Sequence, residues 1–219
     1  MADLVDMIRQ VVDLGGPVIL LLIAASVLVL AVALYKVVQF QIRGVGRHRA
    51  LREAITAWDA GGKADARTAL SRSSSYLAPV VEMAFRADPS ENNRLVAEAE
   101  QRFSKLERGL GSIENVAQLA PLLGLFGTVL GMIEAFQALQ NAGSQVDPSI
   151  LAGGIWVALM TTAAGLAVAM PAALIHAWLT ARMDAERGIA DHAIQTVLHP
   201  QGLRAQATAA VGAGQPTLA

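Results

Sequence analysis

The chain has 219 residues, of which 54% are hydrophobic and only 16% are charged, whereas a soluble globular domain carries about a quarter charged residues. The absence of cysteine excludes disulfides, thiolate metal sites and cysteine nucleophiles. The formal net charge of -1 gives no reason to expect nucleic-acid binding, and the four histidines lack metal-ligand spacing. We therefore expect no metal, no other cofactor and no enzymatic activity.

The first predicted element is a membrane helix over 17–40, preceded by a short segment, 1–16. Its apolar run, PVILLLIAASVLVLAVAL, carries no charge until Lys36. A helix needs about 20 such residues to cross a bilayer core, so this run is long enough. The charged residues before it are net acidic, whereas a cleavable signal peptide opens with positive charge. We expect the helix to be a retained span.

Residues 41–114 predict a set of helices separated by breaks rich in glycine, serine and proline. In the stretch from Glu91 to Leu110, apolar residues recur at spacings of three and four, as in an amphipathic helix. Gly109 and Gly111 are mild interruptions, and we expect this helix to continue into the next membrane span as one long rod.

Two further apolar runs, 115–137 and 150–179, predict a second and a third membrane helix, joined by a loop over 138–149. Trp156 and Trp178 are 22 residues apart, about 33 Å along a helix, which fits interfacial anchors at the two faces of one bilayer. Packing of Trp156 against a neighbouring subunit is the alternative.

After the third span we expect a cytoplasmic helix over 180–199. The last residues, 200–219, are rich in Ala, Gly, Gln and Thr with little periodicity, which predicts a disordered tail.

The distribution of Lys and Arg predicts the orientation of the spans. Region 41–111 has twelve of them and the loop 138–149 has none. Because positive charge favours the cytoplasmic side, we expect a periplasmic N-terminus and a cytoplasmic C-terminus in a bacterial inner membrane. The sequence thus predicts an all-α integral membrane protein with three transmembrane helices, whose long helices extend into a cytoplasmic helical collar.

The second and third spans carry small residues at steps of three and four, which let helices approach closely in lipid. We expect helix packing at Gly124, Gly127, Gly131, Ala158 and Gly165. Pro121 and Pro171 lie in the same spans and are expected to bend them locally. Tight packing with no further role would also explain the glycines and alanines.

Three threonines lie near the middle of these spans: Thr128, Thr161 and Thr162. A hydroxyl in lipid can simply bond back to its own helix. If the small-residue faces meet a cavity, however, the hydroxyls could hold water or contact an ionisable group. No carboxylate lies at the centre of any span, so a proton path would need one from another polypeptide. We take the three threonines as candidate pore-lining residues.

Ionisable residues of the second and third spans lie near their ends. Glu134 is near the outer end, where it is either an interfacial side chain reaching water or part of an outer vestibule that attracts cations. Glu114 lies at the inner edge, and His176 is expected to be interfacial as well.

Two stretches, APLLGLFGTVLGMIEAF and ALMTTAAGLAVAMPA, resemble the two signature helices of the MotA/TolQ/ExbB proton channel family. The similarity is closest to the ExbB and TolQ branch, because MotA-type stators have four membrane helices and this chain has three. The resemblance covers about residues 14–198.

This resemblance implies a homo-pentamer around single-helix copies of an ExbD- or TolR-like partner, each with a membrane aspartate that takes up and releases protons. It places Thr128 and Thr162 near that aspartate and passes energy through a TonB- or TolA-like protein to the outer membrane. Iron-complex import and envelope maintenance both fit. Some ExbB proteins have a glutamate where this chain has Val157, so that glutamate's role does not transfer.

Two other classes of function remain open at this point. One is a structural membrane scaffold without ion conduction, in which close packing explains the small residues. The other is a small-solute transporter, which three helices without an inverted repeat disfavour.

Overall fold

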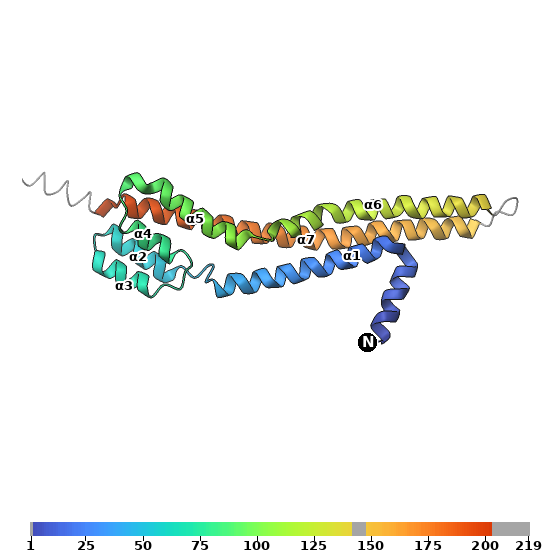
Figure 1. The fold of residues 1–219 in the computed structure, drawn as a ribbon, viewed down its shortest axis with the longest axis horizontal. Helices are drawn as coiled ribbons and strands as arrows, with labels where there is room; N and C mark the ends of the chain where they lie inside the picture. The colour runs from blue at the N-terminus through green and yellow to red at the C-terminus, as the bar shows by residue number, and fades with distance from the viewer. Residues whose placement is uncertain (1, 142–147, 203–219) are drawn as a thin grey trace, which may run out of the picture. The chain divides into compact units, whose positions relative to one another are not determined.

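A computed structural model describes residues 2–141 and 148–202, so half of the predicted loop and most of the predicted tail lie outside it. Within these residues the chain is helical and contains no strand (Figure 1), which confirms the predicted all-α class. The helices are α1 (Ala2–Ile42), α2 (Arg49–Asp59), α3 (Lys63–Ser71), α4 (Ala78–Ala84), the 3-10 turn η1 (Pro89–Glu91), α5 (Asn92–Glu107), α6 (Leu110–Asn141) and α7 (Pro148–Leu198). They divide between two compact units, 1–35 with 109–180 and 36–108 with 181–219.

Three helices among the described residues are long and apolar enough to cross a membrane, which confirms the predicted number of spans. They cover Gly16–Ile42, Leu110–Asn141 and Leu151–Leu198. The last is 48 residues long, about 72 Å at the rise of an α-helix, so a bilayer core of about 30 Å holds only part of it. Its charged residues begin at Arg182, so we take the part before that residue as the membrane-spanning part.

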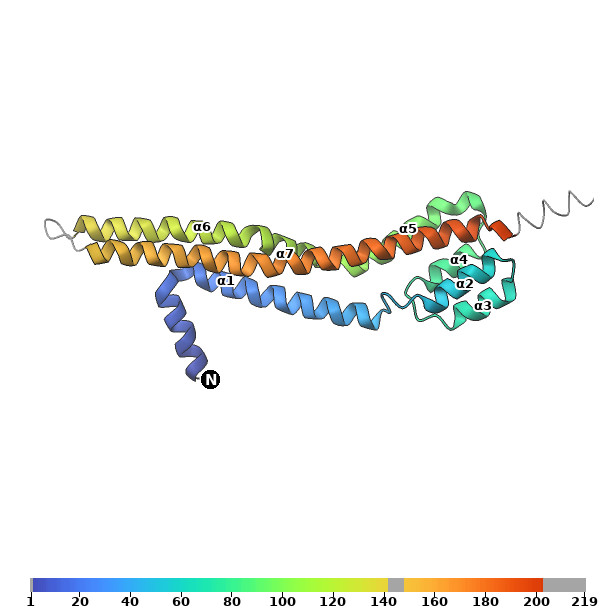
Figure 2. The ribbon, with the colours of Figure 1, turned by 180° about the vertical axis from the view of Figure 1, so that it is seen from behind.

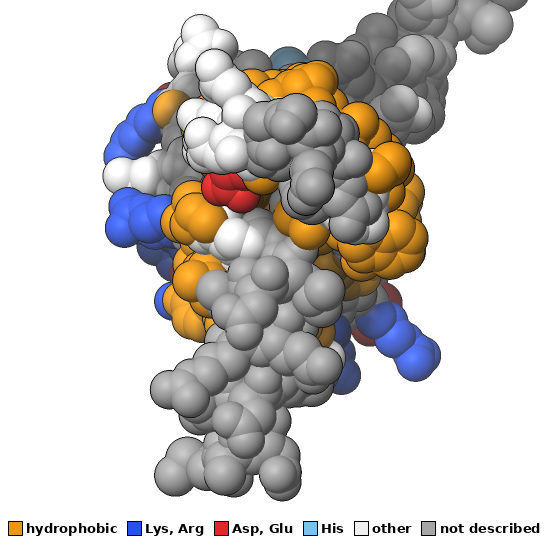
Figure 3. All heavy atoms as spheres, turned by 90° about the vertical axis from the view of Figure 1, so that its right-hand side faces the viewer, with side chains coloured by type: hydrophobic (Ala, Val, Ile, Leu, Met, Phe, Trp, Pro, Cys, Tyr) orange, Lys and Arg blue, Asp and Glu red, His pale blue; other side chains and the backbone are white. Residues whose placement is uncertain are grey.

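In the first unit the part of α1 that follows Gly16 lies beside the pair formed by α6 and α7 (Figures 1 and 2), where Val18 and Leu22 share a buried cluster with Ala120 and Ala169. Among the described residues, this cluster of four is small. Most large apolar side chains instead point outward. Leu174 is 73% exposed, and hydrophobic side chains gather on the described surface at the end where α6 and α7 are joined (Figure 3). Such a surface requires lipid or neighbouring subunits to cover it.

Within α1 the helical geometry breaks at Gly16, whose φ is 64°. Glycine adopts this left-handed conformation without the steric cost that a Cβ atom imposes. Pro17 follows and starts the membrane span, because its fixed φ suits the first turn of a helix.

A second break, at Gly109, separates α5 from α6. Arg108 has an extended ψ of 119° and Gly109 a φ of 98°, so the helical hydrogen bonding stops at Glu107 and restarts at Leu110. The prediction that the helix continues into the second span as one long rod is therefore wrong. The physical reason is that glycine in the left-handed region ends a helix.

In the second unit, helices α2 to α5 and the end of α7 enclose a conventional apolar core. Leu51, Leu77, Phe103 and Met183 are at most 1% exposed. The indole ring of Trp58 stacks on Phe85 with ring centroids 4.1 Å apart.

The same core contains one buried ionisable pair. Nε2 of His48 lies 2.7 Å from Oε2 of Glu186, and the two side chains are only 3% and 1% exposed. The hydroxyl of Tyr76 donates to the same carboxylate oxygen at 3.0 Å, and Nδ1 of His48 lies 3.1 Å from Oγ of Ser75. The amide of Gly46 also approaches Nε2, at 3.2 Å, but one ring nitrogen cannot donate and accept at once, and the carboxylate is nearer.

This network keeps Glu186 ionised. Burial alone raises the pKa of its carboxyl, but the hydrogen bond and charge of His48, together with Tyr76 and Arg182, outweigh burial and hold that pKa below its usual value. Burial and the adjacent carboxylate raise the pKa of Tyr76, so its phenol remains a donor. The network thus joins three segments of this unit: the turn after α1, the residues just before α4, and α7.

We expect Glu186→Gln to lower the free energy of unfolding at pH 7 by about 1–3 kcal/mol, because it removes charge-assisted hydrogen bonds from a buried site. A carboxyl whose pKa is depressed in the folded state stabilises above its unfolded pKa, near 4.3, and that contribution disappears as the pH falls through the folded value. Thermal unfolding in detergent should therefore show the wild-type advantage shrinking in acid. Glu53→Gln is the control, because Glu53 is 54% exposed and pairs only with Arg49 on the surface. Equal melting of Glu186→Gln and wild type at pH 7 would contradict the assignment.

Candidate functional site

The predicted packing residues come together along one seam between α6 and α7. A Cβ atom added at Gly124 would lie 2.9 Å from the carbonyl oxygen of Thr161, and one added at Gly165 would lie 2.6 Å from that of Ala120. Real Cβ atoms almost never come this near to a backbone atom. The two helix backbones therefore touch, which only glycine permits at these positions.

Towards the C-terminal end of α6 the two helices stay close together. A Cβ atom at Gly127 would meet the side chain of Thr161 at 2.7 Å, and one at Gly131 would meet Ala158 at 3.4 Å. Ala158 is 3% exposed. All five residues predicted to pack thus lie where α6 and α7 meet.

The three threonines do not share one environment. Thr161 is 1% exposed, and its hydroxyl donates to the carbonyl of Ala158 at 2.7 Å. The chain's own helices enclose this side chain, so assembly with other subunits cannot open it to a pore. The prediction that Thr161 lines the pore is corrected accordingly, and we assign it to packing of the seam.

Thr128 and Thr162 are only partly buried and lie at the margin of the seam. The hydroxyl of Thr128 donates to the carbonyl of Leu125 at 2.6 Å, within its own helix. The hydroxyl of Thr162 lies 3.4 Å from the carbonyl of Gly124 on the other helix. Each hydroxyl has a single proton, which these carbonyls engage, so each oxygen offers its lone pairs to an outside donor.

The other predicted residues are less constrained. Pro121 and Pro171 lie inside α6 and α7, and both helices run through them. Proline removes one backbone donor in each case, which frees the carbonyl four residues earlier. The side chain of Glu134 is exposed on α6, compatible with either of its two predicted roles.

One contact was not predicted from the sequence. Oε2 of Glu114 on α6 lies 3.9 Å from Nε2 of His176 on α7. The amide of Gln118 donates to Glu114 at 3.3 Å, and the hydroxyl of Thr180 lies 3.4 Å from the same imidazole nitrogen. The sequence did contain a signal for this contact: Glu114 precedes Thr128, and His176 follows Thr162, by the same number of residues.

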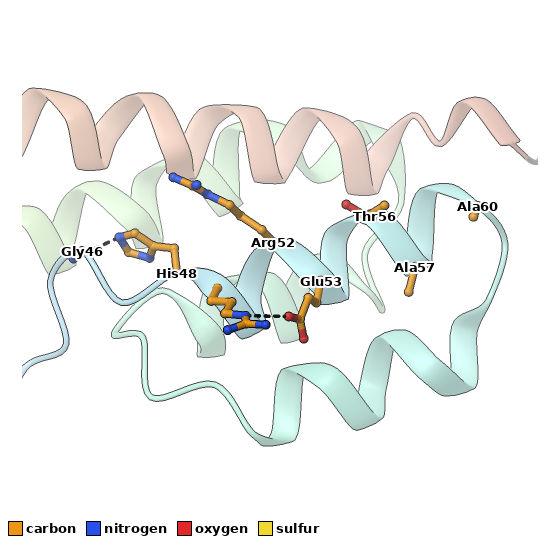
Figure 4. Close-up of a pocket in the computed structure, with 8 residues that line it drawn as sticks. Gly46, His48, Arg52, Glu53, Thr56, Ala57 and Ala60 are labelled. Atoms are coloured by element: carbon orange, nitrogen blue, oxygen red, sulfur yellow. Dashed lines mark hydrogen bonds and ion pairs between the residues drawn. The ribbon is translucent and has the colours of Figure 1, made fainter.

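The second unit has surface pockets that are lined by none of these residues. One of about 720 Å³ runs beside α2 and is lined by Gly46, His48 and exposed side chains such as Arg49 and Glu53 (Figure 4). It is open to solvent, because the side chain of Arg49 is 96% exposed. Among the described residues no group of three His, Cys, Asp or Glu side chains could hold a metal ion.

A comparison with protein families matches residues 71–191 to the MotA/TolQ/ExbB proton channel family. The chain belongs to this family. The match takes in α6, the membrane-spanning part of α7 and part of the second unit, so it includes every candidate site residue. Together with the three apolar helices it identifies a multi-pass membrane protein of a proton channel family.

Individual relatives carry ExbB and TolQ names. The chain is 44% identical over 84 residues to a putative biopolymer transport protein ExbB homolog of Methanothermobacter thermautotrophicus, covering 38% of this chain and 29% of the relative. It is 45% identical over 73 residues to the biopolymer transport protein exbB1 of Vibrio cholerae, covering 33% and 32%. It is 36% identical over 104 residues to the Tol-Pal system protein TolQ of Haemophilus influenzae, covering 46% and 45%. The chain thus spans less than half the length of each.

We expect Gly165→Val to destabilise the first unit by about 1–3 kcal/mol, because the new side chain would overlap the backbone of α6. Gly153→Val is the matched control, because Gly153 lies on the same helix with no atom within 4 Å of an added Cβ. Thermal unfolding of the purified chain in detergent measures both. If the two variants melted together, the close approach of α6 and α7 would be refuted.

Proposed function

We propose that this chain is the channel-lining subunit of a proton-driven motor in a bacterial inner membrane. The observation that carries the proposal is the pair of threonine hydroxyls, Thr128 and Thr162, at the margin of a glycine seam in mid-membrane helices of a proton channel family. The orientation predicted from Lys and Arg puts the N-terminus in the periplasm and the second unit in the cytoplasm.

The proton acceptor comes from a second polypeptide. No carboxylate occurs between Asn115 and Ile133 or between Ile150 and Leu179, so this chain offers only hydroxyls in mid-membrane. A single-helix, ExbD- or TolR-like subunit with a membrane aspartate supplies the missing group. Because both hydroxyl protons are engaged by carbonyls, the threonine oxygens accept a hydrogen bond from the protonated acid and thereby stabilise its neutral form.

Proton movement is then coupled to displacement of the partner. Protonation removes the cost of holding a charge in a low-dielectric site, and deprotonation restores it, so the partner's favoured position alternates. One charge crossing a potential of 100 mV provides about 2.3 kcal/mol. A TonB- or TolA-like protein carries the resulting work to the outer membrane.

Several copies of the chain form the channel, with a pentamer as the expected stoichiometry. The outward apolar side chains of α1, α6 and α7 support this, since they include far more surface than the small buried cluster covers. Part of that surface contacts neighbouring copies and the rest contacts lipid.

We expect Thr128→Val and Thr162→Val to lower proton flux about tenfold, the effect of about 1.4 kcal/mol on the barrier, because one hydrogen bond to the protonated acid is lost. Thr128→Ser and Thr162→Ser keep the hydroxyl and should retain most of the flux. The measurement is dye-reported proton uptake by vesicles containing the complex. Full flux in both valine variants would remove these residues from the pathway.

Purification of the tagged full chain in mild detergent should recover a protein with one membrane helix and an aspartate within it. Mass spectrometry of the purified complex identifies the partner and the number of copies. Recovery of a self-assembly alone, with no proton flux in vesicles, would favour a structural scaffold instead.

A further inference from the structure

The pair Glu114 and His176 lies at the same register as the two threonines. Glu114 precedes Thr128 by 14 residues, and His176 follows Thr162 by 14 residues. Fourteen residues are close to four turns of helix, so each ionisable group lies within about 40° of the face that carries its threonine. Along the axis the separation is about 21 Å on both helices.

Both groups are therefore on the α6–α7 seam at the inner end of the spans. They belong to the same two helices as the threonine pair and to the same unit. Between the threonines and this pair neither helix has another ionisable side chain. A proton leaving the middle of the membrane along these helices meets Glu114 and His176 first.

The chemistry of the pair suits proton transfer. An imidazole nitrogen can accept a proton on its lone pair and donate it again, which is the chemistry that a proton relay requires. Nε2 of His176 lies 3.9 Å from Oε2 of Glu114, so a proton that reaches the imidazole has a second acceptor group beside it.

The pair is also open, in contrast to the other histidine–glutamate pair of this chain. The side chains of Glu114 and His176 are 49% and 24% exposed, whereas those of His48 and Glu186 are 3% and 1% exposed with a 2.7 Å contact. An exposed pair separated by 3.9 Å contributes at most about 1 kcal/mol to stability. Stabilisation of the fold therefore does not account for the pair, whereas a role that requires contact with water fits its exposure.

Building on the proposed function, we propose that His176, assisted by Glu114, is the inner proton-release site of the channel. The partner's carboxylic acid gives its proton to water, and water passes it to the neutral imidazole of His176. The resulting imidazolium is held beside the Glu114 carboxylate and then releases the proton to cytoplasmic water, which regenerates the neutral imidazole. Each transfer moves one proton and no electrons.

The test uses vesicles that contain the complex of the full chain with its aspartate-bearing partner, with a potassium gradient to drive protons inward. We expect His176→Gln to lower flux about tenfold or more, as for loss of a proton-transferring group, and Glu114→Gln to lower it less. His192→Gln is the matched control, because His192 is an exposed histidine of α7 outside the membrane-spanning part, with a hydrogen bond to Thr196 in its own helix. It should leave flux unchanged.

Free imidazole separates proton transfer from packing. Added on the inner side, it should restore flux in His176→Ala, because the smaller side chain leaves the open site accessible to the base. A loss of flux that imidazole does not restore would overturn the proposal in favour of a structural role. Wild-type flux in both His176→Gln and Glu114→Gln, with flux still lowered by Thr128→Val, would overturn it and leave the channel function intact. No flux through the unmodified complex would overturn the channel function itself.

Discussion

The backbone contact between α6 and α7 at Gly124 and Gly165 is the constraint on which the first unit depends. Because the two helices touch without intervening side chains, carbonyls of one helix come within reach of hydroxyls of the other. The same contact leaves no room for large apolar side chains in the seam, and these project outward instead. The close approach at these two glycines thus places hydroxyls and carbonyls along the contact between α6 and α7, while the outer surface of the helices is apolar.

Polar groups in this chain fall into two physical kinds. Thr161 and the pair His48–Glu186 are enclosed and saturated with partners, so their contribution is to hold neighbouring segments in place. Thr128, Thr162 and the pair Glu114–His176 are partly open and keep unused acceptor capacity. Only the second kind can exchange protons with water or with another subunit, and burial distinguishes the two more clearly than residue type.

Hydropathy was sufficient to predict the number of membrane helices, because crossing a bilayer requires mainly length and an apolar composition. The spacing of small residues predicts packing positions, and the structure places these residues where α6 and α7 meet. Gly109 was predicted to be only a mild interruption, since one glycine in an amphipathic pattern costs about 1 kcal/mol and is often tolerated, so the full break was not predicted. The different surroundings of Thr161 and Thr162 could not be predicted either. Adjacent residues are 100° apart around a helix, and the sequence alone does not say which of the two faces the neighbouring helix. The roles of the candidate residues themselves remain predictions.

The second unit has a consequence for the order in which the protein matures. The indole nitrogen of Trp58 donates to the carbonyl of Val197, a residue 139 positions later, and Glu186 reaches His48 from nearly as far. During synthesis α2 to α5 leave the ribosome long before α7, so their apolar core has no lid until the whole of the last span has been made. The second unit can therefore fold completely only after all three spans have been translated. A chain truncated before α7 would expose the apolar core of this unit to proteases and chaperones.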